Sequence, residues 1–306
     1  MMMTVQIINQ LINFNLIHTA EQALMVNWGW MAWNLFLALV PLVISFWLFH
    51  QPRARFLRWI VIVLTSLTFI IGINRYNLGH AINLARQVHQ TYFGTGNIYI
   101  AGAFVLTLIF LGIDIWLFRQ HGTRSLLWWF GFMVFIAFLP NAPYVLTDII
   151  HLIEDIRQGY SIWIISLALI PQYLLFMLIG FQAYVLSLIY FGEYLKRQGW
   201  SQYILPVELI LHALSSIGIY LGRFERFNSW HILTQPDQLV MSIFNDLTEK
   251  KPVLVMIVTF LIIAGLYWLM KQVTLGVIYY RQQTTLKQVM PEAMNAPVVN
   301  SEIKQP

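Results

Sequence analysis

The sequence contains no cysteine and little charge. Cysteine is absent from all 306 residues, which excludes disulfide bonds, thiolate metal ligands and cysteine nucleophiles. Asp, Glu, Lys and Arg make up only 10% of the chain, whereas soluble domains carry about 25%. Hydrophobic residues make up 58%, and the mean hydropathy is +0.66. This composition predicts an integral membrane protein, so its first partner is the lipid bilayer.

Clustered basic residues and common catalytic motifs are also missing. The formal net charge is +5, but Lys and Arg are scattered through short connections, so we predict no nucleic-acid partner. The sequence has no phosphate-binding loop, dinucleotide fingerprint, HExxH or GxSxG motif. It therefore indicates no particular cofactor, and it leaves the oligomeric state open.

Long apolar runs are what the sequence has instead. A helix that crosses a bilayer needs roughly 20 apolar residues, and seven segments approach or exceed this length. We predict an all-α, polytopic membrane helical bundle of about seven transmembrane helices plus interfacial amphipathic helices. The fifth span is expected to tilt or bend near Pro171. The predicted spans are 28–49, 57–73, 98–118, 125–145, 161–191, 203–223 and 252–270.

Three parts are expected along the chain. Residues 1–26 lack the basic start of a signal peptide and are predicted to be an interfacial segment. Residues 27–280 are predicted to form the transmembrane domain. Residues 281–306 are polar and are expected to be a disordered cytoplasmic tail. Within the domain, residues 236–250 have the pattern of an interfacial amphipathic helix.

Basic residues in alternate connections predict the orientation. Arg53, Arg55 and Arg58 follow the first span, and Lys196 and Arg197 follow the fifth. Short connections rich in Lys and Arg face the cytoplasm. We therefore predict a bacterial inner-membrane protein with its N-terminus outside and its C-terminus in the cytoplasm.

The stretch FLPNAPYVLTDIIHLIEDI, residues 138–156, concentrates polar residues after an apolar span. Pro140 and Pro143 should end the span, and Asn141 is placed to cap a new helix. At 100 degrees per residue, the polar side chains of that helix fall within an arc of about 120 degrees. These side chains are Tyr144, Thr147, Asp148, His151, Glu154 and Asp155.

Two interpretations of this helix are open. The pattern alone favours an interfacial helix whose polar face lies in water. The alternative turns the polar face inward, where Asp148, His151 and Asp155 would be catalytic candidates. Their spacing is also a weak candidate for a metal site with oxygen, nitrogen and oxygen ligands.

A second polar stripe runs along the sixth span. Glu208, His212 and Ser215 lie on one face, and ionisable groups inside a span normally face the bundle interior. Gly218 and Gly222 form a GxxxG motif, which permits close helix approach. Arg223 and Arg226 follow on the same face, at the predicted outer end. Asp114, in the third span, is a further intramembrane polar candidate.

The roles of this second stripe also remain open. Glu208 and His212 can satisfy each other four residues apart, with Arg223 extending to the interface. Alternatively, Arg223 and Arg226 meet the carboxylates of the first motif at the same surface. That pairing would be structural, or it would frame a lipid or another anionic ligand.

Three stretches resemble one family. WNLFLALVP (33–41), FLPNAPYVLTDIIHL (138–152) and GIYLGRFERFNSW (218–230) together resemble the bacterial multi-pass membrane family called domain of unknown function 1361. The resemblance covers about 28–231, with 74–97 as an added outer segment. It implies a helical bundle and no specific activity. It also marks motif residues for a structural role, among them Tyr144, Asn228 and Trp230.

The sequence thus predicts a polar site at the extracytoplasmic face and leaves three functions. A binding or assembly component needs only structural roles for these residues. An enzyme acting on a lipid or lipid-linked phosphate would use Asp148 and His151, with Arg223 and Arg226 holding the anion. A proton-coupled transporter would use Glu208 and His212 as a relay.

Overall fold

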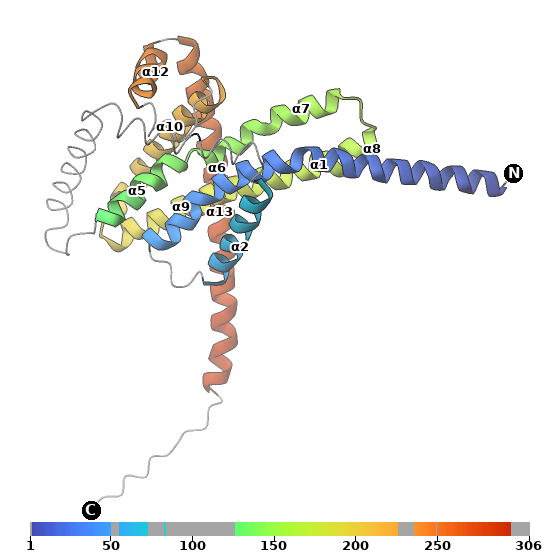
Figure 1. Cartoon of the computed structure of the whole chain (residues 1–306). Helices are drawn as coiled ribbons and strands as arrows, with labels where there is room; N and C mark the ends of the chain where they lie inside the picture. Colours follow the sequence, from blue (N-terminus) through green and yellow to red (C-terminus); the bar gives the residue numbers. More distant parts are fainter. Residues whose placement is uncertain are drawn as a thin grey trace, which may run out of the picture. The chain divides into compact units, whose positions relative to one another are not determined.

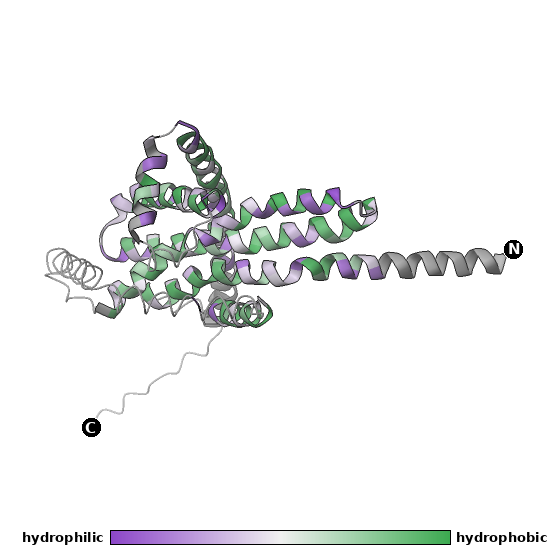
Figure 2. Cartoon of the chain, turned by 45° about the horizontal axis from the view of Figure 1, so that its top comes forward, coloured by the Kyte–Doolittle hydropathy of each residue, from purple (hydrophilic) through white to green (hydrophobic). Residues whose placement is uncertain are grey.

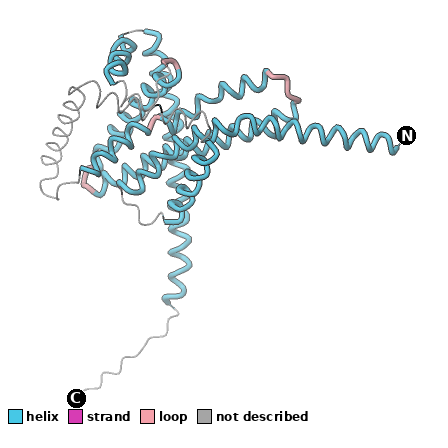
Figure 3. Tube along the Cα trace, viewed as in Figure 1, coloured by secondary structure: helices cyan, strands magenta, loops and turns pink. Residues whose placement is uncertain are grey.

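The computed structural model describes residues 2–49, 55–72, 83, 126–225, 236–248 and 250–294. All regular structure in these residues is helical (Figure 3), which confirms the predicted all-α class. Residues 1–264 form one compact unit and residues 265–306 a second. The helices (Figure 1) are α1 (Met2–Leu48), α2 (Arg55–Gly72), α5 (Leu126–Phe138), α6 (Asn141–Tyr144), α7 (Ile149–Arg157), α8 (Ile162–Ile164), α9 (Ile170–Arg197), α10 (Ile204–Arg223), α12 (Pro236–Thr248) and α13 (Lys250–Met294).

Within the described residues, five helical segments are long and apolar enough to cross a membrane. They are His18–Leu48, Leu127–Arg157, Ile162–Arg197, Ser201–Arg223 and Lys250–Arg281, and Phe56–Gly72 is a shorter apolar helix. Apolar residues dominate these segments in Figure 2. The protein is therefore a helical membrane bundle. The predicted third span, 98–118, lies outside the described residues together with Asp114.

Two predicted boundaries do not appear as breaks in a helix. α1 runs unbroken through residues 26 and 27, because residues 19–27 contain no Pro or Gly and are rich in strong helix formers. α13 continues to Met294, and the predicted disorder of residues 281–306 stays a prediction. Residues 295–306 lie outside the described part.

One end of the bundle is held together where α1 and α9 finish. The Arg197 side chain donates to the backbone carbonyl of Phe49, just after the last turn of α1. Phe49 is fully buried and stacks on Phe191, with ring centroids 5.0 Å apart. The C-terminal ends of α1 and α9 therefore lie at the same end of the bundle. We call this the Arg197 end.

α2 packs against α1. A Cβ atom on Gly72 would lie only 2.7 Å from the backbone nitrogen of Trp33, so the two backbones touch at a position that only glycine permits. Along α1, Trp33 lies 16 residues before Phe49, which is about 24 Å. Trp33 thus lies somewhat less than one hydrocarbon thickness from the Arg197 end.

The long fifth span changes its helical pitch before Pro171. A π-helical segment, Ile165–Leu169, joins α8 to α9. Proline lacks an N–H and its ring crowds the carbonyl four residues earlier, and a wider π turn relieves that contact. The structure thus has a π-helical segment before Pro171, and the predicted tilt or bend of the span stays a prediction.

The sixth span is confirmed as α10, which one 3₁₀ turn precedes. Tyr220 and Leu221 of α10 form a buried cluster with Met256 of α13, and Ile243 of α12 packs against it. The predicted helix at 236–250 is confirmed as α12. Its contact through Ile243 shows how α12 is attached to the unit.

Candidate functional site

The candidate site begins where the helix α5 ends. The chain turns at residues 139–140, forms the single turn of α6, and continues as a 3₁₀ turn, Val145–Asp148, into α7. The predicted break at the two prolines is confirmed. The amide of Asn141 donates to the carbonyl of Phe138, so it satisfies the end of α5.

The predicted role of Asn141 as a helix cap is wrong. α6 is preceded by Pro140 and has no side-chain cap. An N-cap side chain binds the N–H groups two or three residues ahead. Here the first of these is Pro143, which has no N–H, and the second, that of Tyr144, already donates to the carbonyl of Pro140.

Two glycines allow neighbouring helices to pack closely against this break. A Cβ on Gly218 of α10 would lie 2.8 Å from the Cβ atom of Pro140, and a Cβ on Gly180 of α9 would lie 2.7 Å from Cγ2 of Val145. Both distances are shorter than real side chains allow. The predicted close approach at Gly218 is therefore confirmed, and its partner is the proline break itself.

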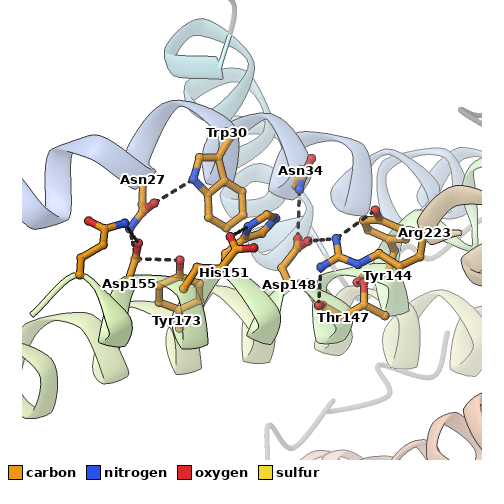
Figure 4. A network of polar contacts seen from close by, with 12 residues as sticks. Asn27, Trp30, Asn34, Tyr144, Thr147, Asp148, His151, Asp155, Tyr173 and Arg223 are labelled. Atoms are coloured by element: carbon orange, nitrogen blue, oxygen red, sulfur yellow. Dashed lines mark hydrogen bonds and ion pairs between the residues drawn. The ribbon is translucent and has the colours of Figure 1, made fainter. Parts of the chain in front are cut away.

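Asp148 lies at the start of α7 and is completely buried. Asn34 of α1 donates its amide to Oδ2 of Asp148 over 3.0 Å. Nη1 of Arg223 lies 3.5 Å from Oδ1 of Asp148. The predicted meeting of Asp148 and Arg223 is confirmed, and it joins α1, α7 and α10 (Figure 4).

Arg223 also holds the turn before Asp148. Its Nη2 donates to the carbonyl of Thr147 over 3.0 Å, and its guanidinium carbon lies 5.9 Å from the ring centre of Tyr144. The side chain is 21% exposed. Arg223 therefore fixes the broken backbone as well as balancing the charge of Asp148.

Asp155 makes a second buried set of contacts one heptad further along. Its Oδ2 accepts hydrogen bonds from the amide of Asn27 at 2.5 Å and the hydroxyl of Tyr173 at 3.0 Å. Gln158 donates to Oδ1. The indole N–H of Trp30 in turn donates to Oδ1 of Asn27. α1, α7 and α9 are thus joined by polar contacts (Figure 4).

The two contact sets form what we call the Asn–Asp ladder. Asn34 pairs with Asp148, and Asn27 pairs with Asp155, so α1 and α7 run antiparallel with both pairs seven residues apart. The side chains are aligned because seven residues are close to two helical turns. Asn27, Asn34, Trp30 and Tyr173 were not predicted as site residues.

α7 buries its aspartates and exposes isoleucines, which is the reverse of a helix on a water-facing surface. Asp148 and Asp155 are at most 6% exposed, whereas four isoleucines of α7 are 41–48% exposed. These four, Ile149, Ile150, Ile153 and Ile156, are called the isoleucine face below. The prediction that the whole polar face lies in water is therefore wrong for both aspartates. The inward alternative describes them correctly.

His151 and Glu154 remain accessible on the flank of α7. Nδ1 of His151 lies 3.0 Å from a carboxylate oxygen of Glu154, and their side chains are 40% and 60% exposed. The imidazole packs against Trp30, with ring centroids 4.9 Å apart. His151 therefore stands apart from the contacts of the aspartates. The described residues contain no group of three or more His, Asp or Glu side chains placed to hold a metal.

The second polar stripe lies inside the bundle. His212 is 2% and Glu208 7% exposed, which confirms the prediction that His212 faces the interior. Its Nδ1 lies 2.8 Å from the hydroxyl oxygen of Tyr184, which is 3.3 Å from the hydroxyl of Ser215. Tyr184, on α9, is a partner that the sequence did not indicate.

Two nearby serines, Ser187 and Ser216, form hydrogen bonds within their own helices. The hydroxyl of Ser187 donates to the carbonyl of Ala183, and that of Ser216 donates to Ala213. The tight contact of Gly218 with Pro140 follows along α10. The predicted site residues Arg226, Asn228 and Trp230 lie outside the described part of the chain.

These features define a multi-pass α-helical membrane protein with a polar cluster at a broken helix. The chain belongs to the family described as protein of unknown function (DUF1361), which it matches over residues 103–264. That range holds Asp148, Asp155 and Arg223 but begins after Asn27 and Asn34, and it extends past the expected limit at residue 231. No curated protein and no solved structure matches the chain.

Proposed function

We propose that the protein is a binding or assembly component of the membrane. The observation that supports this best is the commitment of both buried aspartates to the protein itself. Three of their four carboxylate oxygens accept hydrogen bonds from Asn34, Asn27, Tyr173 and Gln158, and the fourth faces Arg223. Carboxylates held this way stabilise one helix arrangement, whereas a general base must reach a substrate proton.

The recognition surface in this proposal is the accessible flank beside the ladder. It consists of Trp30, His151 and Glu154, which present an indole, an imidazole and a carboxylate together. Aromatic and charged groups held on a rigid support are typical of binding hot spots. The Asn–Asp ladder supplies that support by fixing α1 against α7.

Extraction into native nanodiscs, followed by native mass spectrometry, tests this proposal. The wild-type protein is expected to retain a bound component in a fixed ratio. The double variant His151→Gln/Glu154→Gln should lose most of it at unchanged thermal stability, because both side chains are accessible. Glu193→Gln, an exposed carboxylate on α9, is the matched control and should retain the component.

Two results would contradict the proposal. One is a wild-type protein that carries no component beyond bulk lipid. The other is equal loss in the double variant and in Glu193→Gln, because the effect would then follow charge alone and not the recognition surface.

One observation favours a second candidate, an enzyme acting on a lipid-linked phosphate. Oδ1 of Asp148 has no hydrogen-bond donor, although Arg223 lies 3.5 Å away and is partly exposed. A phosphate oxygen could compete for the same guanidinium. This candidate requires a bound anionic lipid that Arg223→Gln loses and His151→Gln/Glu154→Gln retains. The transporter alternative has less support, because the hydroxyls of Ser187 and Ser216 donate to carbonyls of their own helices.

We also propose a bacterial inner-membrane location with the N-terminus outside. In the sequence, Arg53, Arg55 and Arg58 follow α1, and Lys196 and Arg197 end α9; the C-terminal ends of α1 and α9 meet at the Arg197 end. α10 leads away from that end towards Thr147, which Arg223 contacts. The positive-inside rule then makes the Arg197 end cytoplasmic.

Reporter fusions check this orientation. Fusions after Gln120 and after Gln198 are expected to report a cytoplasmic location, and a fusion after Gly159 an external one. The fusions after Gln198 and Gly159 control each other, since they lie on either side of the apolar segment Ile162–Arg197. The opposite pattern would invert the proposed sidedness while leaving the fold unchanged.

A further inference from the structure

The isoleucine face of α7 is an exposed apolar surface, and its surroundings can be inferred from the structure. Its four side chains are 41–48% exposed, on the helix that buries Asp148 and Asp155. Exposing isoleucine while burying carboxylate is unfavourable in water, since each loses its preferred surroundings. The same arrangement is favourable where the surrounding solvent is hydrocarbon.

The helix segments that follow α7 in the chain also expose large apolar side chains. Ile162 and Trp163 of α8 are 68% and 67% exposed, and Leu167, in the π-helical segment, is 72% exposed. α7 and α8 also belong to the two apolar segments Leu127–Arg157 and Ile162–Arg197, each of membrane-crossing length. Exposed apolar side chains are therefore found on two candidate spans, and Trp163 suits the headgroup boundary.

Helix lengths locate α7 along the membrane normal. Gly72 ends α2 against Trp33, which lies about 24 Å along α1 from the Arg197 end. The next residue of α1, Asn34, binds Asp148 at the start of α7. The hydrocarbon layer is about 30 Å thick, with an interfacial layer on each side. α7 therefore starts near the hydrocarbon edge and enters the interfacial layer.

We propose that the isoleucine face of α7 is a lipid-contact surface, so that α7 is inserted into the membrane interface. The acyl chains contact Ile149, Ile153 and Ile156, and the flank of His151 and Glu154 faces the headgroups. In this arrangement the Asn–Asp ladder is shielded by lipid on one side. This inference concerns a different face from the recognition surface and does not depend on the proposed function.

Site-directed spin labelling tests the surface directly, because the natural chain has no cysteine. Single nitroxide labels at Ile153→Cys and Ile149→Cys are introduced into the full chain in phosphatidylcholine nanodiscs. Their collision rates with oxygen, which concentrates in lipid, and with a water-soluble nickel chelate are compared. Both labels are expected to be several-fold more accessible to oxygen than to nickel. Glu154→Cys is the neighbouring control and should be relatively more accessible to nickel.

Each other outcome overturns the proposal. A label at Ile153 that is mainly accessible to nickel would place the face in water. A label shielded from both reagents, with spin–spin broadening between copies, would mean that a second copy covers the face. Shielding without broadening would mean that another part of the protein covers it. Leu152→Cys, at a position 9% exposed, shows what a shielded label looks like.

Discussion

Replacing Asp148 with alanine is expected to lower the free energy of unfolding by about 3 kcal/mol, because buried partners of opposite charge and polarity are left unpaired. Asn34 loses the acceptor for its amide, and Arg223 loses the charge it faces. Arg223 is partly exposed, so its share of the loss is reduced by solvation. Reversible unfolding by sodium dodecyl sulfate in mixed micelles measures the change.

Two companion variants make this result specific. His151→Gln, at an accessible position on the same helix, should change the free energy of unfolding by less than about 0.5 kcal/mol. The double variant Asp148→Leu/Arg223→Met should recover part of the lost free energy of unfolding, since it removes both charges and leaves neither unpaired. If Asp148→Ala unfolds like the wild type, the ladder does not hold the fold.

Gly218→Ala is expected to destabilise the protein by about 1–3 kcal/mol, as overpacking does in a filled core. The added Cβ would lie 2.8 Å and 2.9 Å from two atoms of the Pro140 ring. A proline ring cannot rotate away, so α10 or the break itself must shift. Gly180→Ala meets a similar obstacle in Val145, whose branched side chain is stiff. The same unfolding experiment measures both variants.

Gly265→Ala provides the matched control for the two glycine variants. Nothing lies within 4 Å of a Cβ built at Gly265, so the higher helix propensity of alanine should leave stability unchanged or raise it by up to about 1 kcal/mol. Equal effects at Gly218 and Gly265 would show that backbone propensity, and not the contact with Pro140, determines the result.

The Asp148–Arg223 contact was predictable because both residues lie in polar stripes at the ends of their helices. An ionisable residue beside a bilayer needs a partner, and few candidates were available. The break at Pro140 followed from proline chemistry in the same way. The side chain of Asn141 was assigned wrongly, because the rule for caps assumes an N–H where Pro143 has none.

The other half of the site was harder to predict. Asn27 and Asn34 are single polar residues in an apolar helix, and each alone indicates little. Their spacing of seven equals that of Asp148 and Asp155, and this match between two helices was the available signal. Tyr184 and Tyr173 gave no comparable signal, because a tyrosine in an apolar span is as suited to packing as to hydrogen bonding.

The π-helical segment before Pro171 has a consequence for the register of the chain. A π turn accommodates one more residue than an α turn, so Ile165–Leu169 behaves like a one-residue insertion in a continuous helix. The residues of α8, which precede this segment, are rotated by about 100 degrees relative to their position in an uninterrupted α-helix. Ile164 is thereby turned inward, at 5% exposure, and Trp163 outward. Deleting one residue there would let the segment close as a regular α-helix with Ile164 and Trp163 kept in place, whereas closing it without a deletion would rotate α8 by about 100 degrees.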